Sequence, residues 1–312
     1  MSQDKAKSVH TTGHVWDDDL QELTNPLPMW WIWTFYVTVI FSIIYWIMYP
    51  AWPIGHSYTK GVGNTITYTA RTVDGKTVQK TTHWNMRSKL MEEMNEHSSE
   101  QKKWFDKVAT MPYESVAKNE DLMSFVNSAG KTLFSDNCAP CHQAGGVGKM
   151  GFAPNLVDDI WIYGGTYDKI QETITNGRNG MMPTFRGVLP DDKIKQVANY
   201  VLSLSGEPHD AAAAKAGDAI FHGEGGCHVC HGEDGTGNPA LGSANLTDKN
   251  WLWADVPGQS TAEGKLGEVV KVVTEGVSRG KMPTWGGPNG RLSPEQIKVL
   301  TLYVHDSLGG GK

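Results

Sequence analysis

The sequence predicts a mainly α-helical protein in which one N-terminal transmembrane helix is followed by two small helical domains in tandem. Three observations predict this fold class. An uncharged apolar stretch near the N-terminus is long enough to cross a bilayer. All four cysteines fall in two C-x-x-C-H motifs, and the regions around the two motifs align with each other.

The apolar stretch runs from Met29 to Tyr49, 21 residues without a formal charge. A helix of this length spans roughly 31 Å, which matches a bilayer core. Tryptophan and tyrosine gather at both ends, as is typical of membrane interfaces. We expect a transmembrane helix over 29–50 rather than a cleaved signal peptide, because polar residues 1–28 precede it and no small-x-small cleavage site follows.

Three hydroxyl residues, Thr34, Thr38 and Ser42, recur at every fourth position of this helix. Small residues often mark a face that packs on another membrane helix, and we favour that interpretation. The alternative is that each hydroxyl bonds back to its own helix. The helix contains no ionisable side chain except tyrosine, so it does not form a proton path by itself.

Residues 51–119 are interpreted as a spacer between the membrane and the later domains. Thr65 to Thr82 alternates β-branched and polar residues around Asp74-Gly75, which predicts a small β-hairpin insertion. Arg87 to Ala109 carries apolar residues at helical spacing and predicts a helix. A docking surface for a partner subunit is the alternative role for this segment.

The two C-x-x-C-H motifs are Cys138-Ala139-Pro140-Cys141-His142 and Cys227-His228-Val229-Cys230-His231. This spacing is the attachment signature of covalently bound c-type haem, and the sequence therefore predicts two haem c groups. Both thiols of a motif add to haem vinyl groups, and the histidine becomes an axial iron ligand. A four-thiolate zinc site and a thioredoxin-type dithiol are the alternatives, but neither needs a histidine after both pairs.

The internal repeat divides the remainder into domains over 120–206 and 207–312. Gly130 before the first motif matches Gly217 before the second, and matching apolar residues at helical spacing close each unit. We interpret each unit as a class I cytochrome c fold. A helix leads into the motif, a long loop carries a methionine, and a C-terminal helix packs back on the first helix.

The axial iron ligands are predicted to be His142 and Met182 in the first unit, and His231 and Met282 in the second. Met182 lies 40 residues after His142, Met282 lies 51 after His231, and each directly precedes a Pro-Thr-aromatic run. The candidates that we consider less suitable are Met150, Met181, His222, His228 and His305. We expect each methionine to serve its own repeat, with an exchange between the two haems as the alternative.

Histidine–methionine ligation occupies both axial positions of the iron, which favours electron transfer over oxygen chemistry. A proximal histidine usually donates its second N–H to a carbonyl, and Pro154 is our candidate for His142. The second unit has Ser243-Ala244 at that point, so we expect the surroundings of the two haems to differ.

Haem c is attached outside the bacterial cytoplasm, so the motifs predict a periplasmic C-terminal part, a cytoplasmic tail over 1–28 and an inner-membrane location. A net charge of −6 gives no indication of nucleic-acid binding. Residues 206–312 carry 13 Asp/Glu against 9 Lys/Arg. This acidic surface either steers a basic redox partner or simply aids solubility.

The run Thr24-Asn25-Pro26-Leu27-Pro28-Met29-Trp30-Trp31, with one span and two haem repeats, resembles the dihaem subunit of cbb3-type cytochrome c oxidases. The resemblance covers residues 14–50 and 112–308 but not 55–85. It implies that a soluble or membrane-tethered cytochrome c, or the quinol-oxidising complex, supplies electrons, which pass to a monohaem subunit and then to the haem–copper catalytic subunit. Oxygen reduction and proton pumping are implied for that core. Some family members carry an extra N-terminal span, which we do not expect here.

Other functions stay open at this point. A free membrane-anchored dihaem cytochrome could serve another dehydrogenase or reductase. A dihaem peroxidase needs an iron that can open, which two methionine ligands disfavour. A haem-based sensor is disfavoured because the sequence offers no signalling domain.

Overall fold

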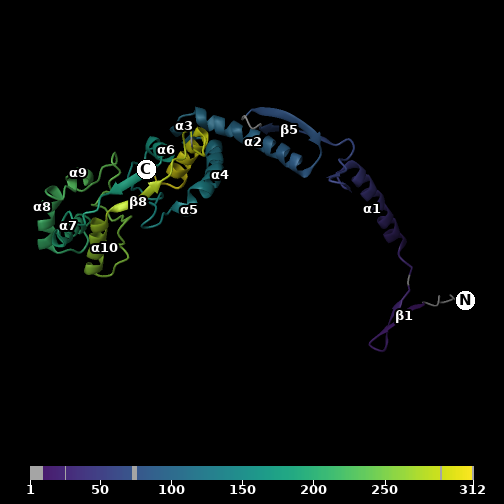
Figure 1. Ribbon diagram of the computed structural model, residues 1–312, viewed down its shortest axis with the longest axis horizontal. Coiled ribbons are helices and arrows are strands. Elements are labelled where there is room, and N and C mark those ends of the chain that lie inside the picture. The colour runs from purple at the N-terminus through teal and green to yellow at the C-terminus, as the bar shows by residue number, and fades with distance from the viewer. Residues whose placement is uncertain (1–9, 25, 72–75, 289, 311–312) are drawn as a thin grey trace. The chain divides into compact units, whose positions relative to one another are not determined.

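The computed structural model describes residues 10–24, 26–71, 76–288 and 290–310 (Figure 1). The chain divides into two compact units, Met1–Glu100 and Gln101–Lys312, which we describe separately. Helix α2 runs across the boundary between them.

The first unit contains the membrane helix. Strands β1 (Thr11–Trp16) and β2 (Leu20–Leu23) form an antiparallel pair that the sequence did not lead us to expect. Helix α1 (Met29–Met48) follows, and it is the one helix among the described residues that is long and apolar enough to cross a membrane. It ends two residues before the predicted end, because the residue before Pro50 adopts an extended backbone.

The hydroxyl stripe on α1 bonds to its own helix. Thr34 Oγ1 donates to the Trp30 carbonyl at 2.9 Å, and Ser42 Oγ donates to the Thr38 carbonyl at 2.8 Å. Thr38 Oγ1 bonds in the same way, to the Phe35 carbonyl at 2.7 Å. The structure therefore contains the hydrogen bonds that the alternative interpretation expects. A role of this face in packing on another helix stays a prediction.

Two further antiparallel pairs follow α1, namely β3 (Pro53–Ile54) with β4 (Ser57–Tyr58) and β5 (Thr65–Arg71) with β6 (Thr77–His83). The second pair lies where the hairpin is predicted, and the Asp-Gly turn that would join its strands lies outside the described residues. The predicted helix over 87–109 is confirmed as α2 (Met86–Thr110).

The second unit is helical apart from one pair of strands. Its elements are α3 (Tyr113–Ala117), α4 (Glu120–Asn137), α5 (Ala139–His142), α6 (Tyr167–Asn176), β7 (Arg178–Met182), α7 (Asp191–Leu204), α8 (Ala211–His222), α9 (His228–His231), α10 (Ala262–Glu275), β8 (Val277–Met282), α11 (Pro294–Leu302) and the π-helical turn η1 (Tyr303–Ser307).

The terminal helices of the two repeats are exchanged. Helix α7, which closes the first repeat, packs on α8 of the second, and α11, which closes the second, packs on α4 of the first. The prediction that each C-terminal helix packs back on its own first helix is therefore wrong. Two matching glycines permit these contacts: a Cβ on Gly217 would lie 2.0 Å from the Gln196 carbonyl oxygen, and one on Gly130 would lie 2.6 Å from Tyr303 Cβ.

Strands β7 and β8 form the crossing point, where the sequence predicted only loops (Figure 1). They pair antiparallel, and Gly180 lies opposite Gly280, its own counterpart in the repeat. An element that pairs with its own copy at equivalent residues indicates an approximate two-fold relation between the repeats. Each chain segment beyond the strand therefore continues into the other repeat's half of the unit.

The core of the second unit contains two apolar clusters that each pack against the first cysteine of one motif. The first-motif cluster joins α4, α6, α11 and η1, with Phe134, Ile170, Ile174, Leu292, Ile297, Leu300 and Val304 buried. The second-motif cluster joins α7, α8 and α10, and its buried members are Leu189, Ile194, Val197, Ala198, Val201, Leu202, Ile220, Ala254, Val256, Val269 and Val273.

Candidate functional site

Each C-x-x-C-H motif forms one helical turn, which follows α4 directly in the first repeat and follows α8 after four intervening residues in the second. Cys138 ends α4, and Cys141 and His142 lie on α5. Cys227, Cys230 and His231 take the same positions around α9. The four cysteines are free thiols.

The histidine that ends each motif is oriented by a backbone carbonyl. His142 Nδ1 lies 3.0 Å from the Pro154 carbonyl oxygen, as the sequence predicted, and His231 Nδ1 lies 2.9 Å from that of Ala244. Burial lowers the pKa of both imidazoles, although these carbonyls act in the opposite direction. A neutral ring that donates from Nδ1 leaves Nε2 free to bind a metal.

The surroundings of the second motif contain one hydroxyl that the first lacks. Ser243 Oγ donates to the Cys230 carbonyl oxygen and accepts from the Asn238 backbone N–H at 3.1 Å. The matching residue in the first repeat, Ala153, has no polar side chain. The polar surroundings of the two motifs therefore differ at this position.

The methionines lie in the opposite clusters from those expected. Met282 packs on the first-motif cluster together with Cys138, and Met182 packs on the second-motif cluster together with Cys227. This placement differs from the expectation that each methionine serves its own repeat. The reason is the β7–β8 crossing, since each methionine ends the strand that leads into the other half.

Hydrogen bonds beyond the strands hold both methionine segments across the repeat boundary. Thr184 Oγ1 donates to the Thr274 carbonyl at 2.6 Å, and Thr284 Oγ1 donates to the Asn176 carbonyl at 3.0 Å. The approach is close, because a Cβ on Gly177 would lie 2.4 Å from the Met282 carbonyl oxygen. Each Pro-Thr-aromatic run thus binds to the backbone of the other repeat, and this contact holds the methionine that precedes the run.

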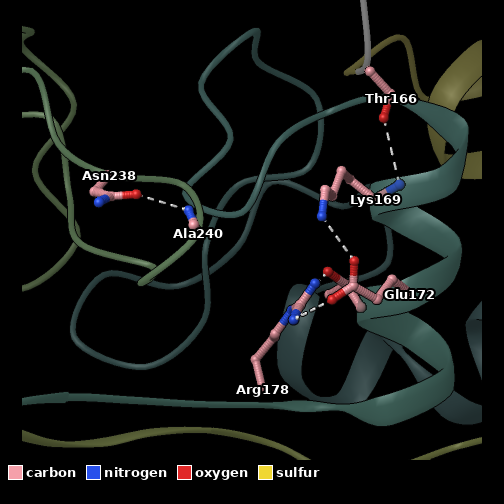
Figure 2. A network of polar contacts seen from close by, with 7 residues as sticks. Thr166, Lys169, Glu172, Arg178, Asn238 and Ala240 are labelled. Atoms are coloured by element: carbon pink, nitrogen blue, oxygen red, sulfur yellow. Dashed lines mark hydrogen bonds and ion pairs between the residues drawn. The ribbon is translucent and has the colours of Figure 1, made fainter.

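An ion-pair chain anchors the start of β7 (Figure 2). Lys169 and Arg178 both contact Glu172 of α6, at 2.9 Å and 3.0 Å. Arg178 Nε also donates to Thr173 Oγ1 at 2.9 Å, and its guanidinium lies 4.4 Å from the centre of the Tyr163 ring. These contacts fix the beginning of the strand that ends in Met182.

The structure does not assemble a zinc site from the four cysteines. The two pairs belong to separate clusters, and among the described residues no group of three or more His, Cys, Asp or Glu side chains could hold a metal ion. Burial raises the pKa of Cys138 to about 12. The thiolate that zinc binding and dithiol chemistry require is therefore disfavoured there.

The less suitable ligand candidates have other surroundings. Met181 and Met150 are 78% and 46% exposed. His222 lies between the backbone of Asp218 and Glu233, and His228 Nδ1 contacts the Phe221 carbonyl. His305 is partly buried, and its ring stacks on the Tyr167 ring with 3.9 Å between the centroids.

The residues present fit a covalently attached haem in each cluster. Each cluster packs against a motif cysteine and a methionine and supplies an apolar lining, and the histidine that ends each motif is held through Nδ1, which leaves Nε2 for a bond to iron. The sequence reasoning missed two tryptophans in these clusters, Trp161 and Trp251. The signal was available, because each lies six residues after the Asn of an Asn-Leu pair that the repeats share.

Two family models match the chain. The N-terminal domain of cytochrome oxidase-cbb3 FixP matches residues 8–56, and cytochrome c oxidase cbb3-type subunit III matches residues 126–201 and 212–304. The second model matches once per repeat, which agrees with the internal duplication.

Curated relatives match along almost the whole chain. The cbb3-type cytochrome c oxidase subunit FixP of Azorhizobium caulinodans is 44% identical over 318 residues, covering 99% of this chain and 96% of the relative. Subunit CcoP of Azospirillum brasilense is 37% identical over 327 residues, covering 99% and 98%. Subunit CcoP of Rubrivivax gelatinosus is 41% identical over 297 residues, covering 95% and 83%.

These alignments also extend the resemblance that the sequence motifs indicated. An alignment that covers 99% of the chain runs across residues 55–85, which we had expected to lie outside the resemblance. The chain belongs to the subunit III family of cbb3-type cytochrome c oxidases.

Proposed function

We propose that this chain is the membrane-anchored dihaem electron-transfer subunit of a cbb3-type terminal oxidase. It would accept electrons from a cytochrome c donor and deliver them, by way of a monohaem cytochrome c subunit, towards the haem–copper catalytic subunit. Membership of the family supports this role, and so does the packing of one methionine and one motif cysteine in each cluster.

The observation that carries the proposal is the exchange of the methionine segments. Cys138, Cys141 and His142 would hold one haem c, with Met282 as the sixth ligand. Cys227, Cys230 and His231 would hold the other, with Met182. Support comes from Met282 packing with Cys138 and Met182 packing with Cys227.

Bound haem c supplies one-electron redox chemistry at its iron. The protein's contribution is to keep each site closed and unreactive. His142 and His231 stay neutral and oriented through their Nδ1 contacts. Met182 and Met282, whose segments are held by cross-repeat hydrogen bonds, would supply the sixth ligands, and such ligation would exclude oxygen and peroxide and raise the reduction potential.

Covalent haem attachment outside the bacterial cytoplasm supports a periplasmic second unit and a cytoplasmic N-terminal segment. Helix α1 then anchors the subunit in the inner membrane. No ionisable side chain except tyrosine lies on α1, so we assign no proton path to this helix by itself.

Isolation in mild detergent tests the proposed assembly. The chain should co-purify with b-type haem and copper in a particle that oxidises reduced cytochrome c. Recovery of a dihaem protein alone, without b haem or copper, would support a free membrane-anchored cytochrome for another respiratory enzyme.

Optical spectroscopy of the oxidised chain tests the ligand chemistry. Two closed sites predict a thioether–iron charge-transfer band from both haems. A high-spin signal from one haem in the native protein would instead support a dihaem peroxidase.

A further inference from the structure

The chain that follows the membrane helix folds back onto the last turn of that helix. The Val62 N–H donates to the Ile47 carbonyl at 3.1 Å, and Asn64 Nδ2 donates to the Met48 carbonyl at 3.1 Å. The approach is close, because a Cβ on Gly61 would overlap the Met48 carbonyl oxygen. Ile47 and Met48 end α1, so the returning chain lies at the depth of the last turn of the membrane span.

These contacts satisfy backbone groups that the end of a helix leaves without partners. The last four carbonyls of an α-helix have no donor within the helix. Lipid supplies no water to replace that donor, so an unpaired carbonyl is costly there. The returning chain provides donors for two of the four, which suits a helix that ends at the edge of the hydrocarbon.

A small hairpin, β3 with β4, lies between the helix and the returning chain and exposes apolar side chains. The Thr59 N–H donates to the Trp52 carbonyl at 2.8 Å and closes the hairpin. A two-stranded hairpin by itself is marginally stable at best in water, so its apolar surface needs a cover. The exposed side chains of this segment are Trp52 at 52%, Ile54 at 64%, Tyr58 at 50% and Val62 at 70%.

The charge of this region is complementary to a phospholipid surface. The sequence has no acidic residue between Glu22 and Asp74, and Lys60 and Arg71 are the formal charges there. Lys60 is exposed and lies two residues before Val62, so its ammonium group can reach lipid phosphates while its stem lies along apolar surface. Trp, Tyr and Lys are the residue types that anchor membrane proteins at the interface with water.

Direct contacts join the hairpin region to the start of α2. The Trp84 N–H donates to the Asn64 carbonyl at 2.9 Å, and the Trp84 ring meets the Tyr49 ring edge-on with 5.0 Å between the centroids. A hollow of about 290 Å³ at this junction suits a lipid chain better than water because its lining is mainly apolar. Its lining residues are Pro50, Ala51, Tyr58, Trp84, Asn85 and Met86.

We infer that residues 50–64 form an interfacial anchor, which lies in the headgroup region of the bilayer with its exposed apolar side chains against phospholipid and Lys60 on the phosphates. This inference rests on the proposed span of the membrane by α1. Interfacial residues set the depth and tilt of a membrane helix. The anchor therefore fixes both for α1 and holds the start of α2 at the membrane surface.

The experiment uses the full-length haem-loaded chain in nanodiscs of phosphatidylcholine and phosphatidylglycerol. Haem attachment takes up the native cysteines under the proposed function, so Ile54→Cys and Val62→Cys each offer one thiol to a nitroxide label. Val78→Cys is the matched control, because Val78 is 45% exposed and lies opposite Ala70, about 17 Å along β5 from Thr65. Power-saturation electron paramagnetic resonance measures collisions with oxygen, which enters lipid, and with a nickel chelate, which stays in water, each referenced to nitrogen.

We expect the oxygen-to-nickel collision ratio at positions 54 and 62 to exceed that at position 78 severalfold, in the isolated chain and in the purified oxidase particle. Equal ratios at the three positions would place the segment in water and overturn the inference. Loss of access to both reagents at positions 54 and 62 in the oxidase particle would show that a partner subunit covers them, which also overturns it. The proposed function has separate readouts, namely co-purification with b-type haem and the thioether band, so its failure is distinguishable.

Where a labelled variant does not retain haem, photolabelling of the wild-type chain tests the same contact. A phospholipid that carries a diazirine close to its glycerol is incorporated in the nanodisc and activated by light. Mass spectrometry should find adducts within residues 50–64 as well as on α1. Adducts confined to α1 would contradict the inference.

Discussion

Gly177 lies where the two repeats cross, and its replacement by alanine tests the crossing. The residue has a positive φ of +68°, and a Cβ would lie 2.4 Å from the Met282 carbonyl oxygen and 2.8 Å from the Pro283 carbonyl carbon. Real Cβ contacts essentially never fall below 3.0 Å, and both neighbours are backbone atoms that cannot rotate away. Gly177→Ala should therefore push the Met282 segment away from the first-motif cluster.

The magnitude follows from two contributions. A left-handed backbone costs a residue with a Cβ about 1–2 kcal/mol. Overlap in a well-packed interior adds about 1–3 kcal/mol. Gly187 provides the matched control in the same segment, because its φ is +77° and nothing lies within 4 Å of its Cβ position. Gly187→Ala should cost only the first contribution.

The assay is thermal unfolding of the haem-loaded chain in detergent, followed by the optical charge-transfer band. At about 2–4 °C per kcal/mol, Gly187→Ala should lower the midpoint by about 2–8 °C, and Gly177→Ala should lower it clearly further. Gly177→Ala should also weaken the thioether band, whereas Gly187→Ala should not. Equal midpoints and intact bands in the two variants would refute the crossing.

Three smaller effects follow from single contacts. Ser243→Ala removes the donor to the Cys230 carbonyl and should lower the free energy of unfolding by about 1 kcal/mol. The reduction potential should shift in only one haem wave. Shifts in both waves would contradict a local role for Ser243. Burial raises the pKa of Tyr113 to about 12, so the stability from its neutral phenol is present below pH 10 and lost as pH rises through 12. Tyr113→Phe should therefore flatten the fall in unfolding midpoint over that range, and an unchanged profile would contradict this. Asp210 accepts hydrogen bonds from the Ala212 and Ala213 N–H groups at the start of α8. Asp210→Ala should therefore lower the free energy of unfolding by about 1 kcal/mol, measured by thermal unfolding. An unchanged unfolding midpoint would contradict a stabilising role for this cap.

The parts of the fold that depend on local pattern could be predicted from the sequence. The membrane helix needed only 21 uncharged residues, and the helix over 87–109 needed only helical spacing. The contact between His142 and the Pro154 carbonyl followed from short separation along the chain. Such features can be predicted because they depend on residues that lie close together along the chain.

The exchange of helices and methionines could not be predicted in the same way. Because the two repeats share matching positions, sequence similarity alone does not tell whether α7 packs on α4 or on α8, and the structure shows it on α8. The deciding features are long-range, namely the Gly180–Gly280 pairing and the close approach at Gly177. The strands β7 and β8 were missed because each is stabilised mainly by its partner rather than by its own residues.

The most direct test of the exchanged ligation uses a chain with a single haem. In a Cys138→Ala/Cys141→Ala background, the remaining haem is attached at Cys227 and Cys230. Met182→Ala should then abolish its thioether–iron band, whereas Met282→Ala should leave that band intact, and the reciprocal background should give the reverse. Loss of the band with Met282→Ala and its retention with Met182→Ala would show that each methionine serves its own repeat, and would contradict the account.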